Sequence, residues 1–73
     1  MTTEGEYRVG VSFNPSGNPQ VDVIKRRTAD LIDILADLSA GRTQPGAREA
    51  SLAMTAYEDA AMWAVKAVTK PER

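Results

Sequence analysis

The sequence predicts a small all-α protein, an antiparallel two-helix hairpin that follows an extended N-terminal arm and assembles into a homo-oligomer. Two long segments, about 19–40 and 47–70, have the apolar spacing and composition of helices, and the short connection "GRTQPG" lies between them. A chain of 73 residues has room for one domain. Because a domain of this size buries only about 60% of its unfolded surface, self-association is expected.

The N-terminal segment predicts no helix. Residues 1–6 are small and polar, which is typical of a mobile tail. From Tyr7 to Phe13 apolar residues then alternate with smaller or polar ones, a period of two that indicates extended backbone. We therefore expect a flexible tail and extended arm over 1–12, and a hairpin domain over 13–73.

The start of the first long helix is marked by three residues. Asn18 is a good N-cap, Pro19 suits the first helical position, and Asp22 places negative charge in the first turn. Gly41 is placed to end the helix. The second helix, from about Ala47, is rich in alanine, the best helix former.

The apolar residues of both helices form more than one stripe. The expected seam of the first helix comprises Val21, Ile24, Thr28, Leu31, Leu35 and Leu38, and the matching stripe of the second comprises Ala50, Met54, Tyr57, Ala61, Ala64 and Val68. Outside these lines fall Val23, Ile32, Ile34, Leu52, Ala56 and Trp63. One partner helix cannot cover all of them, so we expect further copies of the chain to do so.

Composition excludes several classes of function. The chain has neither cysteine nor histidine, so it lacks the residues of most nucleophile–base pairs and transition-metal sites, and we expect no enzyme, no cofactor and no metal. A net charge of −1 argues against binding a DNA or RNA polymer. The first residues do not resemble a signal peptide, and charges interrupt the alanine-rich helix, which argues against a membrane span. We therefore expect a cytoplasmic protein with no membrane partner.

A cationic cluster follows a turn-rich segment in "FNPSGNPQVDVIKRR". Lys25, Arg26 and Arg27 are consecutive, so they fan around the helix and form either a solvated face or, with the preceding loop, part of an anion site. Phe13 is either a core anchor or a ring that stacks on a base. Asn14 is most simply a turn residue.

The remaining candidates have structural explanations. We expect Trp63, with Met62, to contact the core or another subunit. Glu58 and Asp59 are adjacent on a helix and therefore diverge, which spoils them as an acid–base pair. Lys70, in the last turn, complements the helix dipole unless an anion lies nearby.

Taken together, these segments resemble a known family. The aromatic–polar–Pro segment, the "IK" and "ADLID" of the first helix, and "REASLAMTAYEDAAMWAVKA" in the second are similar to the phage-encoded anti-CBASS cyclic-oligonucleotide sponges, whose helical hairpin is shared with the anti-Thoeris sponges. The resemblance spans about 13–70. It implies a homohexamer that sequesters cyclic di- or trinucleotides, or cyclic ADP-ribose isomers, at subunit interfaces without cleavage, in the cytoplasm of an infected bacterium.

The resemblance also implies ligand-binding residues. The aromatic contact falls on Phe13, where relatives tend to have tyrosine, so ring stacking is kept and the phenolic hydrogen bond is lost. Asn14 is the polar residue beside it, and the basic phosphate contact falls on Lys25. A base contact falls on Arg27 or Thr28, and a late basic contact on Lys70.

Two other classes of function are compatible with the sequence. One is a helical oligomeric module that binds another protein or regulates it, and the other is a minimal nucleotide hydrolase. A sponge gains thermal stability with cyclic nucleotides, an adaptor does not respond, and a hydrolase turns the ligand over.

Overall fold

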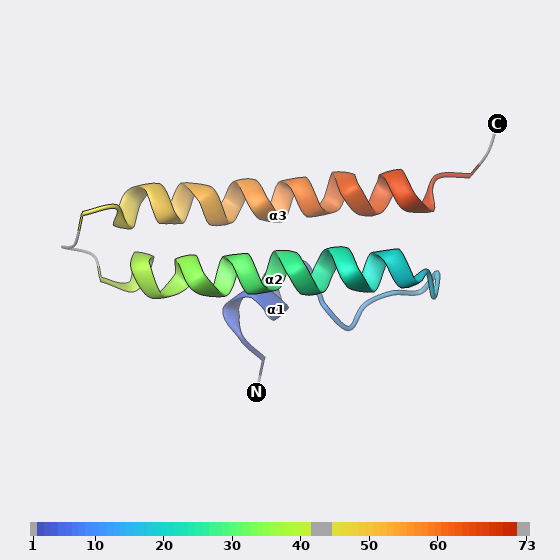
Figure 1. Ribbon diagram of the computed structural model, residues 1–73, viewed down its shortest axis with the longest axis horizontal. Helices are drawn as coiled ribbons and strands as arrows, with labels where there is room; N and C mark the ends of the chain where they lie inside the picture. Colours follow the sequence, from blue (N-terminus) through green and yellow to red (C-terminus); the bar gives the residue numbers. More distant parts are fainter. Residues whose placement is uncertain (1, 42–44, 72–73) are drawn as a thin grey trace.

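The computed structural model describes residues 2–41 and 45–71. In this part of the chain the order of elements is α1 (Glu4–Val9), α2 (Pro19–Ala40) and α3 (Ala47–Thr69), with no strand. Figure 1 shows α2 and α3 side by side and antiparallel, with α1 beside the middle of α2. The predicted all-α hairpin is therefore confirmed.

Helix α2 begins at the residues that the sequence indicated. The Asn18 side chain accepts a hydrogen bond of 2.8 Å from the Gln20 N–H, and Pro19 occupies the first helical position. The Asn18 amide also donates to the Val68 carbonyl at 3.1 Å, so the same residue joins the start of α2 to the end of α3. This bond links the start of one antiparallel helix to the end of the other.

Helix α1 corrects the expected extended arm. Thr3 and Glu6 form a capping box, in which the Thr3 hydroxyl accepts from the Glu6 N–H at 3.1 Å and the Glu6 carboxylate accepts from the Thr3 N–H at 2.8 Å. Gly10 ends the helix with a left-handed φ of 63°, a conformation that favours glycine. The alternating pattern from Tyr7 onward misled because it begins inside a helix that starts before it.

The buried line of α2 also differs from the expected seam. Val21, Ala29 and Ile32 are buried against the rest of the chain, whereas Leu31 and Leu38 are 42% and 43% exposed. The prediction that placed Ile32 outside the seam and Leu31 inside it is therefore wrong. The physical reason is that α1 packs on α2 as well, so the covered side of α2 is rotated toward the residues that face both neighbours.

Helix α3 contributes the expected side to this core. Ala50, Met54 and Ala61 are buried, while Tyr57 stays 38% exposed at the edge of the stripe. Because two of the three buried side chains are alanines, the backbones of α2 and α3 can approach closely.

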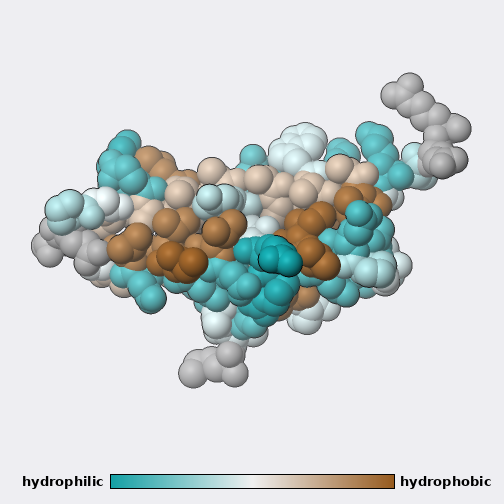
Figure 2. Space-filling view, in the orientation of Figure 1, coloured by the Kyte–Doolittle hydropathy of each residue, from teal (hydrophilic) through white to brown (hydrophobic). Residues whose placement is uncertain are grey.

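The molecule is a single layer of helices. Its principal extents are 49 × 28 × 12 Å, so no second layer covers either broad face of the described residues. Large apolar side chains reach the surface from both long helices, namely Val23, Leu31, Ile34, Leu38, Leu52, Tyr57, Met62 and Trp63. Figure 2 shows apolar residues on either side of a hydrophilic centre. Within residues 2–41 and 45–71, none of the helices has the length and apolarity that a membrane span requires.

Candidate functional site

Phe13 and Lys25 lie together where the loop after α1 crosses the start of α2. The Lys25 ammonium donates hydrogen bonds to the carbonyls of Gly10, at 3.1 Å, and of Phe13. Its Nζ atom also lies 5.3 Å from the centroid of the Phe13 ring, within cation–π range. The loop thus wraps around the cation and holds the ring beside it.

The two side chains differ sharply in exposure. Phe13 is 69% exposed, which excludes the core-anchor interpretation for the single chain, whereas Lys25 is only 9% exposed. An exposed ring beside a fixed cation can stack on a flat base while the cation pairs with a phosphate.

A hollow of about 230 Å³ lies beside this pair. It is lined by Phe13, Asn14, Pro15, Ser16, Val21, Lys25, Val65 and Thr69. Val65 and Thr69 come from α3, and sequence reasoning missed them. Their spacing of four residues near the end of α3, opposite the start of α2, is the signal that would have indicated them.

A second hollow of about 230 Å³ lies on the other side of Lys25. Its lining residues are Arg8, Val9, Lys25, Glu58, Ala61, Met62 and Val65. Arg8 and Glu58 form an ion pair of 3.5 Å across its wall. Because both hollows share Lys25 and Val65, that lysine lies between them.

Asn14 organises the loop. Its amide donates to the Asn18 carbonyl at 2.9 Å and to the Asp22 carboxylate at 3.0 Å, and its oxygen accepts from the Ser16 hydroxyl at 2.8 Å. The turn role expected for Asn14 is therefore confirmed, although the residue also lines the hollow beside Phe13.

The cationic cluster divides among three surroundings. Lys25 is buried, Arg26 pairs with Glu6 at 2.9 Å and Asp30 at 3.1 Å, and Arg27 is exposed. The side chains diverge as their consecutive positions require.

Arg27 and Thr28 lie apart from the ring and the cation. Arg27 lines a separate hollow of about 480 Å³ with Val11, Asp22, Val23, Arg26 and Asp30. Two arginines face two aspartates there, so the formal charges of the lining residues balance. Thr28 donates its hydroxyl to the Ile24 carbonyl at 2.7 Å, a bond within α2.

Lys70 follows the last residue of α3 and is exposed. The residue before it, Thr69, lines the hollow beside Phe13. The end of α3 therefore brings Lys70 to the same end of the hairpin as Phe13 and Lys25.

The fold defines a class, the small helical-hairpin proteins. Residues 5–69 match the family model described as Acb2/Tad1, hairpin domain. The chain therefore belongs to the Acb2/Tad1 hairpin family, the family of the anti-CBASS and anti-Thoeris sponges. Comparisons with curated proteins and with solved structures gave no match.

Proposed function

We propose that this protein binds cyclic di- or trinucleotides and sequesters them without cleavage. The observation that carries the proposal is the exposed Phe13 ring beside the Lys25 ammonium, on a hairpin whose family comprises sponges. The ring contacts a base and the ammonium neutralises a phosphate. Binding of this kind requires no transition state to be stabilised and therefore no catalytic group.

The size of the hollow supports a site that is completed by a second subunit. Pockets that enclose small ligands usually measure about 300–1,000 Å³, and the hollow beside Phe13 has about 230 Å³. A cyclic dinucleotide carries two bases and two phosphates, so a twofold interface that supplies one ring and one lysine from each subunit matches its symmetry.

The exposed apolar surface supports such an assembly. Ile34 is 64% exposed and Trp63 is likewise 64% exposed, on different helices of a single-layer molecule. Association of several copies removes this surface from water. We propose a homohexamer, the assembly that the resemblance implies.

The remaining candidate residues are assigned to the assembly. Arg27 and Thr28 line neither hollow beside Lys25, so we assign them a base contact only where subunits meet. Lys70 is assigned a phosphate contact next to Thr69. The proposed setting is a bacterial cytoplasm during phage infection, where loss of the messenger prevents an immune response.

The second candidate is a helical module that binds another protein. The exposed apolar residues of α2 and α3 favour it equally, because they fit any helical partner. Only the response to nucleotides separates the two functions.

A thermal-shift screen makes this distinction. The panel comprises cyclic di-AMP, cyclic di-GMP, 3′,3′-cyclic GMP–AMP, cyclic tri-AMP and cyclic ADP-ribose. At a hundredfold excess over Kd, a ligand stabilises the folded state by about 2.7 kcal/mol, which raises the Tm of a domain of this size by at least about 10 °C. An absence of any shift across the panel would leave the protein-binding module as the better account.

A matched pair of variants locates the binding. Phe13→Leu removes the ring next to Lys25, and Tyr7→Leu removes a ring in α1 that is also exposed. Loss of one stacked base contact costs about 1–3 kcal/mol of binding free energy. We therefore expect the shift to fall in Phe13→Leu and to persist in Tyr7→Leu, and equal shifts would place the site elsewhere.

A further inference from the structure

We propose that α1 is a positioning element for the ligand site, and that Gly5 and Asp33 act through it on Lys25. Docking of α1 on α2 holds the Gly10 carbonyl at the position from which it orients the Lys25 ammonium beside Phe13. This inference rests on the proposed function, since it concerns how the same site is prepared for a phosphate.

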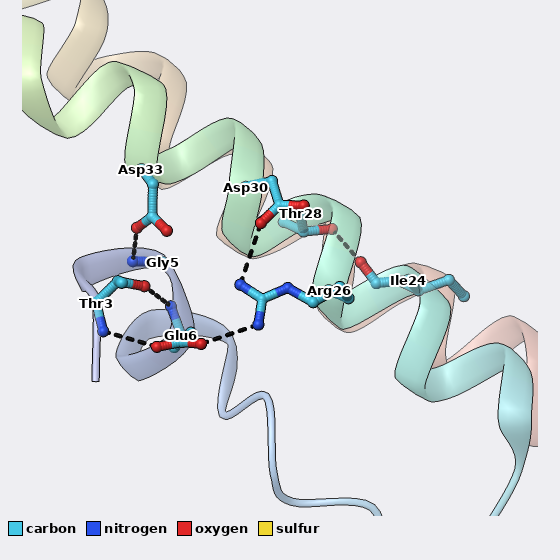
Figure 3. Close-up of polar contacts among 8 residues, drawn as sticks. All are labelled: Thr3, Gly5, Glu6, Ile24, Arg26, Thr28, Asp30 and Asp33. Atoms are coloured by element: carbon cyan, nitrogen blue, oxygen red, sulfur yellow. Dashed lines mark hydrogen bonds and ion pairs between the residues drawn. The ribbon is translucent and has the colours of Figure 1, made fainter. Parts of the chain in front are cut away.

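Gly5 is the point of closest approach between α1 and α2. It is buried, and its N–H donates to Asp33 Oδ1 at 2.7 Å (Figure 3). A Cβ atom at this position would lie only 2.0 Å from the Ala29 carbonyl oxygen, which is backbone and cannot move aside. Any side chain here therefore forces α1 away from α2.

Ion pairs from Glu6 and Arg8 add to the docking of α1. Arg26 bridges Glu6 of α1 and Asp30 of α2 (Figure 3), and Arg8 reaches Glu58 of α3. These ion pairs are partly exposed, and such pairs contribute little stability. The Gly5–Asp33 hydrogen bond is part-buried and is the shorter of the two side-chain hydrogen bonds between α1 and α2 in the described residues.

The end of α1 connects this docking to the lysine. The left-handed Gly10 donates its N–H back to the carbonyls of Glu6 and Tyr7 and turns the chain. Its own carbonyl then accepts from the Phe13 N–H at 2.9 Å and from Lys25 Nζ at 3.1 Å. If α1 moves, this acceptor moves with it.

The geometry leaves the lysine one free donor. An ammonium has three N–H groups, and the carbonyls of Gly10 and Phe13 take two of them. The third is the one available to a ligand phosphate. Fixing a flexible lysine before binding reduces the entropy that binding must overcome, so the docked α1 prepares the site.

Three variants test the chain of contacts. Gly5→Ala blocks docking, Asp33→Ala removes the acceptor of the Gly5 N–H, and Asp33→Asn keeps a side-chain oxygen that can accept the same bond. If α1 is docked on α2 in only a tenth of the molecules of a variant, the affinity for the ligand falls about tenfold. For 3′,3′-cyclic GMP–AMP, measured by isothermal titration calorimetry, we expect this loss in the first two variants and recovery in Asp33→Asn. The exposed Ser51→Ala on α3 is the control that keeps wild-type affinity.

A readout without ligand separates positioning from the proposed function. The Lys25 side-chain protons lie near the Phe13 ring, so their NMR resonances carry its ring-current shift. We expect these resonances to move toward random-coil values in Gly5→Ala and to stay unchanged in Ser51→Ala. Unchanged Lys25 resonances in Gly5→Ala, or wild-type affinity in that variant, would overturn the inference. If the wild-type protein binds no nucleotide of the panel, the proposed function fails, and the resonances alone decide whether α1 positions Lys25.

Discussion

The ammonium of Lys25 lies 5.3 Å from the centroid of the Phe13 ring and donates to the Phe13 carbonyl. One lysine therefore holds the backbone of the residue whose ring it faces. Lys25 holds the loop through its hydrogen bonds and is also the proposed contact for the ligand phosphate. A change at Lys25 is therefore expected to affect both stability and binding.

Replacement of Lys25 by methionine tests the structural part of this role. Lys25→Met removes the donor to the carbonyls of Gly10 and Phe13, and the net contribution of a hydrogen bond from a charged group is about 1.5–3 kcal/mol. We expect a lower free energy of unfolding in urea. Lys66→Met is the control, because Lys66 is exposed and faces the Trp63 ring at 5.4 Å. Equal destabilisation by the two variants would contradict a special role for Lys25.

The two isoleucines of α2 are expected to respond differently. Ile32 is fully buried and Ile34 is 64% exposed. Removal of a buried methylene group in Ile32→Val costs about 0.5–1.5 kcal/mol of unfolding free energy. Ile34→Val should cost less in dilute solution, as measured by urea denaturation. A larger loss from Ile34→Val would mean that the buried side of α2 has been wrongly assigned.

Acid is expected to loosen α1. The hydrogen bond from Arg26, with that from the Thr3 backbone, holds the pKa of Glu6 below its ordinary value of 4.5. Because the folded pKa is lower than the unfolded one, ionised Glu6 stabilises the docked helix above about pH 4.5, and this contribution is lost as the pH falls through the lowered pKa.

Hydrogen exchange of the α1 amides measures this effect. Their protection should decrease below pH 4.5 in the wild-type protein, after correction for the intrinsic exchange rate. The decrease should be smaller in Glu6→Gln, which lacks the Glu6 carboxylate, while the Asp33 carboxylate that accepts from the Gly5 N–H is unchanged. An identical pH profile in the two proteins would assign the effect to another group.

Self-association is expected to depend on the exposed residues of α3. Trp63→Lys places a charge on a surface where the wild-type ring is 64% exposed, so it should change the stability of the single chain little and weaken an interface strongly. Sedimentation velocity should show a smaller species than the wild-type assembly. An unchanged sedimentation coefficient would remove Trp63 from the interface.

The long helices could be predicted because their signals are local. Asn18 and Pro19 mark the start of α2 in the sequence as they do in the structure. Helix α1 could also have been predicted, since Thr3 and Glu6 have the spacing of a capping box, yet the alternation after Tyr7 concealed it.

The site could be predicted only in part. Phe13 and Lys25 were candidates from the sequence, each with an alternative structural explanation, but the burial of the lysine depends on where α1 places Gly10. The burial of Ile32 in place of the predicted Leu31 also depends on α1, because α1 packs on α2 and changes which side of that helix is covered. Tertiary contacts of this kind leave no periodic signal in the sequence.

Recovery of the bound messenger tests the central claim most directly. The protein is incubated with 3′,3′-cyclic GMP–AMP, separated from free ligand by gel filtration and denatured by heat, and the released nucleotide is quantified by chromatography. The account predicts that intact nucleotide elutes with the wild-type protein and that Phe13→Leu retains much less. Recovery of a linear product, or no nucleotide in the protein fraction with any member of the panel, would contradict it.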